Sequence, residues 1–144
     1  MKAREYLQQI RIMDIKIVQR ITELSQMRDR ISIISGIDYS KDRVQTSPTT
    51  GNKQIETLVD LEAEISRMIN KEAELKHRII GEIQQLENPI YVDVLFRRYV
   101  DCQYFEEIAV DMMYSYSRIR HIHADALRAF ERYYLESTHD DTDI

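Results

Sequence analysis

Residues 105–127 read FEEIAVDMMYSYSRIRHIHADAL, and their pattern decides the C-terminal fold. Apolar residues recur at helical spacing in two runs, with polar residues between them. The first run places a set of apolar side chains on one face of a short helix: Phe105, Ile108, Ala109 and Met112. The alanine is small where a second helix must pass close by. The pattern therefore predicts two helices joined by a tight turn, which is the layout of a helix-turn-helix.

Ser115 opens the predicted second helix, because serine is a favoured N-cap residue. On this helix a buried stripe recurs every three or four residues, through Ile119, Ile122, Ala126 and Phe130. Successive residues are about 100° apart around a helix, so the other positions are assigned to the outward face and its flanks. They are Tyr116, Ser117, Arg118, Arg120, His121 and Arg128.

The start of the second helix in this layout is the part that enters the major groove of DNA. An arginine there reaches guanine O6 and N7 with two hydrogen bonds, or a phosphate through its charge. Serine hydroxyls and the free N–H groups of a helix start suit phosphate oxygens. We therefore predict double-stranded DNA as the partner, contacted by Ser115, Tyr116, Ser117, Arg118, Arg120, His121 and Arg128.

Two long helices are predicted upstream, over residues 3–35 and 54–87. The first has a heptad seam through Ile10, Ile17, Leu24 and Ile31, followed three residues later by Met13, Met27 and Ile34. The second has a seam of Leu58, Ile65, Ile79 and Leu86 with Leu61, Met68 and Leu75, and it is interrupted by Glu72 and Glu82. Helices of similar length with facing seams indicate a long antiparallel coiled-coil hairpin over residues 1–87.

The segment between these helices, residues 36–53, is polar and has no periodicity, so we expect a flexible loop. A role of its own for this loop is a second interpretation that the sequence leaves open. Outside the seams the helices carry more apolar residues than two helices bury: Ile12, Ile15, Val18, Val59 and Ile80. We therefore predict a homo-oligomer formed through the N-terminal helices, or the docking of a partner helix.

Asn88-Pro89 separates the hairpin from the C-terminal region. A domain over residues 88–134 then contains three short predicted helices, over 90–100, 105–112 and 115–134. The last residues, 135–144, are polar and acidic, and we expect them to form a disordered tail. The predicted fold class is all-α: a long helical hairpin followed by a three-helix helix-turn-helix domain.

Composition limits the class of protein. Of the 144 residues, 31% are charged, and 3 glycines and 2 prolines are too few for a protein rich in tight turns. No apolar run has the length of a signal peptide or a membrane span, and a single cysteine cannot form an internal disulfide. We therefore expect a cytoplasmic protein without membrane contact. The net charge of −5 argues against a general nucleic-acid coat protein, so DNA binding requires a local basic patch.

Catalytic and metal sites are not indicated. His121 and His123 stand two residues apart and point to different faces of a helix, and the sequence supplies no third ligand beside them. The adjacent acids Glu106 and Glu107 are not spaced as a general acid and base pair. We expect no enzyme activity, no metal and no cofactor.

The stretch EEIAVDMMYSYSRIRHIHADAL resembles the C-terminal helix-turn-helix of bacterial sigma factors, known as region 4, and VLFRRYVDCQYF resembles the helix before it. Together with AREYLQQIRIMDIKI, DRVQTSP and LVDLEAEI, these segments resemble a family of small phage and prophage proteins of Gram-positive bacteria. Those proteins join a helical N-terminal region to a domain similar to sigma region 4. They are regarded as transcriptional regulators akin to late-gene activators of the RinA and ArpU type.

The resemblance implies a phage or prophage transcriptional regulator in the cytoplasm of a bacterial host. It places the promoter-reading positions at Tyr116, Ser117, Arg118, Arg120 and His121. Because sigma region 4 also docks on RNA polymerase, it implies the polymerase as a second partner. Two alternatives follow from the same residues. One is a protein-interaction module that binds the polymerase or another regulator without reading DNA, and the other is a DNA-packaging accessory.

The sequence departs from the sigma pattern at four positions. Met113 stands where the turn often has glycine or asparagine, and Cys102 stands where glycine is usual before the first helix. Tyr104 replaces a serine or threonine cap, and Ser117 replaces an acid. A residue other than glycine in a left-handed turn costs roughly 1 kcal/mol or more, so we expect a reshaped turn at Met113.

Overall fold

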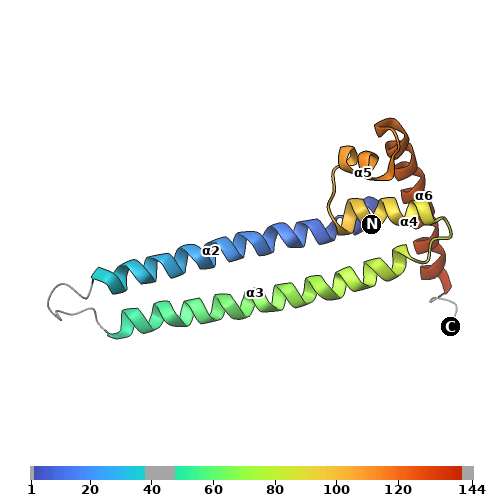
Figure 1. Cartoon of the computed structure of the whole chain (residues 1–144). Helices are drawn as coiled ribbons and strands as arrows, with labels where there is room; N and C mark the ends of the chain where they lie inside the picture. The colour runs from blue at the N-terminus through green and yellow to red at the C-terminus, as the bar shows by residue number, and fades with distance from the viewer. Residues whose placement is uncertain (1, 38–47, 141–144) are drawn as a thin grey trace. The chain divides into compact units, whose positions relative to one another are not determined.

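The computed structural model describes residues 2–37 and 48–140, and it is all-helical over those ranges. Its elements are α1 (Ala3–Leu7), α2 (Gln9–Ile37), α3 (Pro48–Ile83), α4 (Pro89–Leu95), a π-helical turn η1 (Phe96–Val100), α5 (Phe105–Met112) and α6 (Tyr116–Asp140) (Figure 1). The predicted all-α class is thereby confirmed. None of the helices in these ranges combines the length and the apolar character that a membrane crossing requires.

The chain forms two compact units that are not divided where the sequence predicted. One unit contains residues 13–72, and the other contains the residues up to 12 together with those from 73 onward. The predicted boundaries, 1–87 and 88–134, instead assigned both ends of the long helices to one hairpin domain. The structural reason is that α1 and the last turns of α3 belong with the C-terminal helices.

In the unit of residues 13–72, α2 and α3 lie side by side (Figure 1). Leu24, Leu61 and Ile65 form a buried cluster, against which Met27 and Leu58 pack. The predicted seam is therefore confirmed at these positions, whereas the predicted seam residue Ile34 lies outside the described side chains. Ion pairs join Arg20 to Glu64 and Arg28 to Glu62 across the seam. Because these pairs are exposed, apolar burial contributes most of the stabilisation.

The ends of the long helices differ from the prediction. The first helix is interrupted at Gln8, so α1 and α2 replace a single helix over 3–35, and α2 continues to Ile37. The helix α3 begins at Pro48 instead of residue 54. Proline suits a first helical position, because its φ is fixed and it has no N–H group to leave unpaired. The predicted loop over 36–53 is therefore wrong at both ends, and residues 38–47 lie outside the described ranges.

The C-terminal segment is more helical than predicted. The helix α6 continues to Asp140, so the expected disordered tail is wrong for residues 135–140. Residues 141–144 lie outside the described ranges. The helix predicted over 90–100 is a short α-helix, α4, followed by η1. The N–H group of Asp101 bonds to the carbonyl of Phe96 at 3.1 Å, which is the wider spacing of a π-turn.

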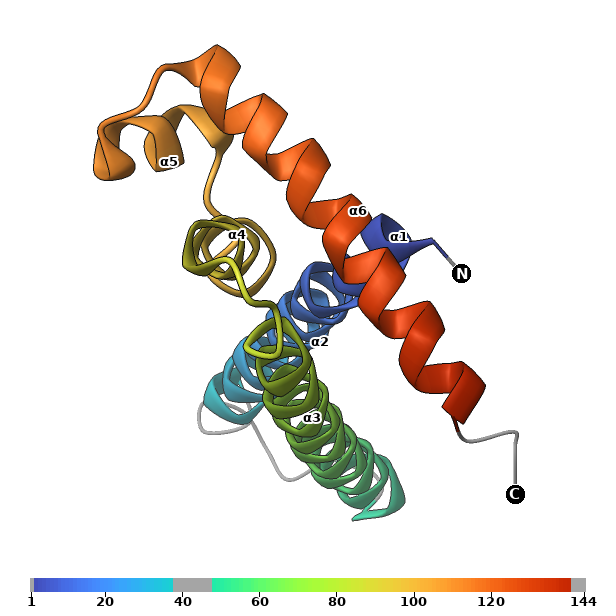
Figure 2. The same ribbon diagram turned by 90° about the vertical axis from the view of Figure 1, so that its right-hand side faces the viewer.

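The interior of the second unit is built mainly on α6. Of its predicted stripe residues, Ile119, Ala126 and Phe130 are fully buried, whereas Ile122 is only partly buried. Near the start of α6, Ile119 packs with Val94, Ile108 and Ala109, and α5 lies against this end of the helix (Figure 2). Further along α6, the ring of Tyr6 from α1 stacks on Phe130 at 6.1 Å. The hydroxyl of Tyr6 donates to Glu82, one of the two acids that interrupt the α3 seam, at 2.7 Å.

Two residues other than glycine adopt left-handed backbone conformations among the described residues, Cys102 (φ 57°) and Met113 (φ 59°). Met113 ends α5, and its neighbour Tyr114 donates its N–H to the carbonyl of Ala109 at 3.0 Å, which closes the helix. The expectation of a reshaped turn is therefore wrong, because Met113 adopts the left-handed conformation that glycine usually takes. The packing of Ile119 on Ala109 requires a tight turn between the two helices. The free energy of this packing offsets the cost of the left-handed conformation at Met113.

We predict that Met113→Gly stabilises the fold. Glycine removes a left-handed penalty of roughly 1–2 kcal/mol and loses part of that gain to the greater freedom of the unfolded chain. Because the Met113 side chain is 92% exposed, little packing is lost. The free energy of unfolding, measured by urea denaturation, should rise by about 1 kcal/mol. Met113→Ala, which keeps the penalty, should leave it unchanged. A less stable Met113→Gly protein would contradict this account of the turn.

Candidate nucleic-acid interface

The start of α6 is fixed by a hydrogen-bonded cap. Ser115 Oγ accepts the backbone N–H of Arg118 at 3.1 Å, and the Ser115 carbonyl accepts the N–H of Ile119 at 3.0 Å. The predicted N-cap role of Ser115 is confirmed. An α-helix leaves its first N–H groups without helical acceptors, and here those groups belong to the exposed residues Tyr116 and Ser117.

Every residue predicted to contact DNA has an exposed side chain: Ser115, Tyr116, Ser117, Arg118, Arg120, His121 and Arg128. Ser115 precedes α6 and five of the others lie in its first two turns, and we call residues 115–121 the α6 start. Arg128 lies about two turns further along the helix. It forms an ion pair with Asp125 at 2.9 Å, so its charge is already compensated.

The arginines of the α6 start lie against aromatic rings. The guanidinium carbon of Arg118 is 4.5 Å from the ring centroid of Tyr114. That of Arg120 is 5.8 Å from the centroid of Tyr116, and Arg120 Nη1 donates to the Tyr116 hydroxyl at 3.3 Å. Such contacts orient a guanidinium group without neutralising it. In residues 2–37 and 48–140, neither arginine forms an ion pair with a carboxylate.

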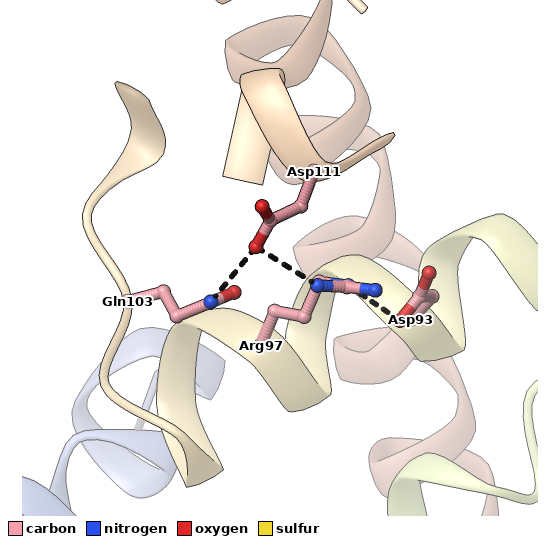
Figure 3. A network of polar contacts seen from close by, with 4 residues as sticks. All are labelled: Asp93, Arg97, Gln103 and Asp111. Carbon is pink, nitrogen blue, oxygen red and sulfur yellow. Dashed lines mark hydrogen bonds and ion pairs between the residues drawn. The ribbon is translucent and has the colours of Figure 1, made fainter. Parts of the chain in front are cut away.

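A polar network joins α4, η1 and α5 (Figure 3). Arg97 Nε donates to Asp93 at 2.9 Å, and Arg97 Nη1 donates to Asp111 at 3.3 Å. Gln103 Nε2 donates to the same oxygen of Asp111 at 3.1 Å. The network compensates the charge of Arg97 and connects the last turn of α5 to the elements before it.

Arg98, the next residue, has partners of another kind. Its guanidinium carbon lies 4.2 Å from the ring centroid of Phe105, and its Nη1 donates to the carbonyl of Gln103 at 2.9 Å. Arg120 lies 5.9 Å from the centroid of the same ring. Two arginines from separate elements, η1 and α6, therefore share one aromatic ring of α5.

A partly buried histidine lies behind these arginines. The His123 ring stacks on Tyr99 at 5.6 Å and meets Phe105 edge to face at 4.9 Å, and its Nε2 shares a hydrogen bond of 2.7 Å with the Tyr99 hydroxyl. Burial, followed by the charges of Arg98, Arg4 and Arg120 in that order, lowers the pKa of His123 from 6.5 to about 4. His123 is therefore neutral at pH 7.

Sequence reasoning did not find Arg98, Tyr114 or His123 as parts of this site. Tyr114 and Arg118 are four residues apart, a spacing at which side chains meet on helices, so their contact was the easiest to anticipate. Arg98 gave no comparable signal, since the adjacent pair Arg97-Arg98 does not indicate which arginine meets Phe105 and which meets Asp111. The π-turn sets that direction, and a regular helical pattern does not reveal such a turn.

No family model, curated protein or solved structure matches the chain. Over the described residues, no group of three or more histidine, cysteine, aspartate or glutamate side chains is placed to hold a metal ion. The α6 start is thus characterised by exposed hydroxyl groups and arginines held on aromatic rings, and this chemistry favours an anionic partner.

We predict that His123 makes the stability of the fold depend on pH. The folded pKa of about 4 lies below the ordinary value of 6.5, so the unfolded chain binds the proton more tightly. The free energy of unfolding should therefore be highest above pH 6.5 and fall as the pH decreases towards 4. His123→Gln, which does not titrate, should show a smaller decrease in urea denaturation at each pH.

His77→Gln is the matched control, because His77 is an exposed histidine of α3. It should keep the pH dependence of the wild type. A His123→Gln protein with the wild-type dependence would show that another group is responsible.

Proposed function

We propose that this protein is a phage or prophage transcriptional regulator that reads double-stranded DNA through its C-terminal helices. In this proposal α5 and α6 are the two helices of a helix-turn-helix, and the α6 start enters the major groove. The regulator acts as a late-gene activator in the bacterial cytoplasm, with RNA polymerase as a second partner. It acts by binding and has no catalytic role.

The proposal is carried by the arginines of the α6 start. The chain has a net charge of −5, yet Arg118 and Arg120 are exposed, lie on aromatic rings and form no ion pair in the described part of the chain. Guanidinium groups in this state remain able to bond guanine O6 and N7 or phosphate oxygens. The neighbouring Ser115 and Ser117 add hydroxyl donors.

The backbone of the turns also supports the proposal. Cys102 and Met113 are left-handed, and they are the two positions at which the sigma-factor pattern has glycine, or glycine or asparagine. Since left-handed conformations are uncommon for other residues, this agreement is a second, independent similarity to that pattern.

We also propose that the N-terminal helices form an antiparallel hairpin that associates with a second copy of the chain. The seam of Leu24, Leu61 and Ile65 already joins α2 to α3. On α2, the side chains of Ile15, Val18 and Ile21 are nevertheless 45–60% exposed. A second chain that covers this face would remove their apolar surface from water and place two α6 helices in one molecule.

DNA binding is tested by selecting duplexes from a random pool and measuring affinity for the selected site at fixed salt. Arg120→Ala should weaken specific binding by roughly 1–3 kcal/mol if its guanidinium contacts a base. Arg67→Ala removes the same charge from an exposed position on α3 and should leave the affinity unchanged. Equal affinities for wild type and Arg120→Ala would exclude Arg120 from the reading residues.

Self-association is tested by sedimentation equilibrium. Val18→Glu places a charge on the exposed apolar face of α2, so the protein should shift from dimer towards monomer. Arg67→Gln makes the same change in net charge elsewhere on the long helices and should preserve the dimer. A wild type that is monomeric at high concentration would refute the proposed association.

A further inference from the structure

Phe105 organises two arginines that are 22 residues apart in the sequence. The guanidinium carbons of Arg98 and Arg120 lie 4.2 and 5.9 Å from the centroid of its ring, so they cannot be more than about 10 Å apart. Two cations at this separation repel each other in the unliganded protein. An anion that binds beside both guanidinium groups would be attracted to each of them, and this attraction would offset their mutual repulsion.

Carboxylates do not relieve this repulsion in the described part of the chain. Glu106 and Glu107 follow Phe105 directly, but they form no ion pair with Arg98 or Arg120. Arg98 makes a single hydrogen bond there, from Nη1 to the carbonyl of Gln103, although a guanidinium has five N–H donors. The remaining donors of this half-buried guanidinium form no hydrogen bond within the described part of the chain.

A neutral ring lies against Phe105 beside these arginines. The His123 ring meets Phe105 edge to face at 4.9 Å. Burial, followed by the charges of Arg98, Arg4 and Arg120, lowers the pKa of His123 to about 4, so His123 is neutral at pH 7. The two arginines, from η1 and α6, are therefore the cations at this aromatic ring.

We infer that Arg98, held beside Arg120 on the ring of Phe105, binds a phosphate of the DNA strand that Arg120 contacts. Phosphates follow each other every 3.4 Å of helix axis along a strand while the strand turns about that axis, so two cations within about 10 Å of each other reach the same short stretch of one strand. A backbone contact of this kind fixes the register in which a recognition helix enters the groove. This inference rests on the proposed function and adds a contact outside the α6 start.

The experiment measures the salt dependence of binding to a mixed-sequence DNA duplex by fluorescence anisotropy over a series of KCl concentrations. Each lost phosphate contact should reduce the magnitude of the slope of log Kobs against log[salt] by about 0.9. Arg98→Ala and Arg98→Gln both remove the charge and should each show this reduction. Arg98→Lys keeps the charge and should keep the wild-type slope, whereas a purely structural role would not be rescued in this way. Arg67→Ala should match the wild type.

The outcomes separate the two proposals. If the wild type binds the duplex and both Arg98→Ala and Arg98→Gln keep its slope, the phosphate contact of Arg98 is refuted and the proposed function stands. If the wild type binds no duplex DNA, both are refuted. Because Arg98 also bonds to the Gln103 carbonyl, Arg98→Ala is compared only where circular dichroism shows the wild-type helix content. Arg98→Gln retains a side-chain N–H donor for that carbonyl and tests the contact even if Arg98→Ala does not fold.

Discussion

The C-terminal unit depends on the packing of Ile119 against Ile108 and Ala109. This contact holds α5 against the start of α6, and it allows only a short connection between them. The connection forces Met113 into a left-handed conformation, and the Ser115 side chain then caps the next helix. Burial of the three apolar side chains provides several kcal/mol, which exceeds the roughly 1–2 kcal/mol cost of the turn. The position of every exposed residue from 115 to 121 follows from this packing.

A second constraint is how the positive charges of the arginines in this unit are balanced. Arg97 and Arg128 have carboxylate partners, so their charges are satisfied within the chain. Arg98, Arg118 and Arg120 lie on aromatic rings, which hold a guanidinium group in place and leave its charge available. An acidic protein thereby presents a local positive surface. The network of Arg97 with Asp93 and Asp111 contributes indirectly, because it connects α5 to η1, where Arg98 lies.

Periodicity predicted the elements whose burial dominates the fold. The heptad seam identified Leu24, Leu61 and Ile65, and the spacing on α6 identified Ile119, Ala126 and Phe130, all of which are buried. Apolar spacing is a local property of the sequence, so it can be read directly. The cap at Ser115 was also readable, because it depends on one side chain and the N–H group three residues later.

The parts that sequence reasoning missed depend on contacts between distant residues or on weak local signals. The pairing of Arg98 with Arg120 on Phe105 requires the π-turn of η1 and the packing of α5, and neither leaves a periodic pattern. The extra helix at residues 135–140 continues α6 through a polar segment whose composition is typical of a tail. The break at Gln8 lies before the first seam residue, Ile10, where no glycine or proline marks it, and α1 then packs on α6 through Tyr6.

The central claim is that the α6 start reads DNA, and a genome-wide binding screen of the host at stated salt tests it most directly. The wild type should enrich a set of sites with a common sequence. A protein carrying both Arg118→Ala and Arg120→Ala should enrich none of them while keeping the wild-type stability. A wild type that enriches no sites would contradict the account and favour a module that binds RNA polymerase or another regulator without reading DNA.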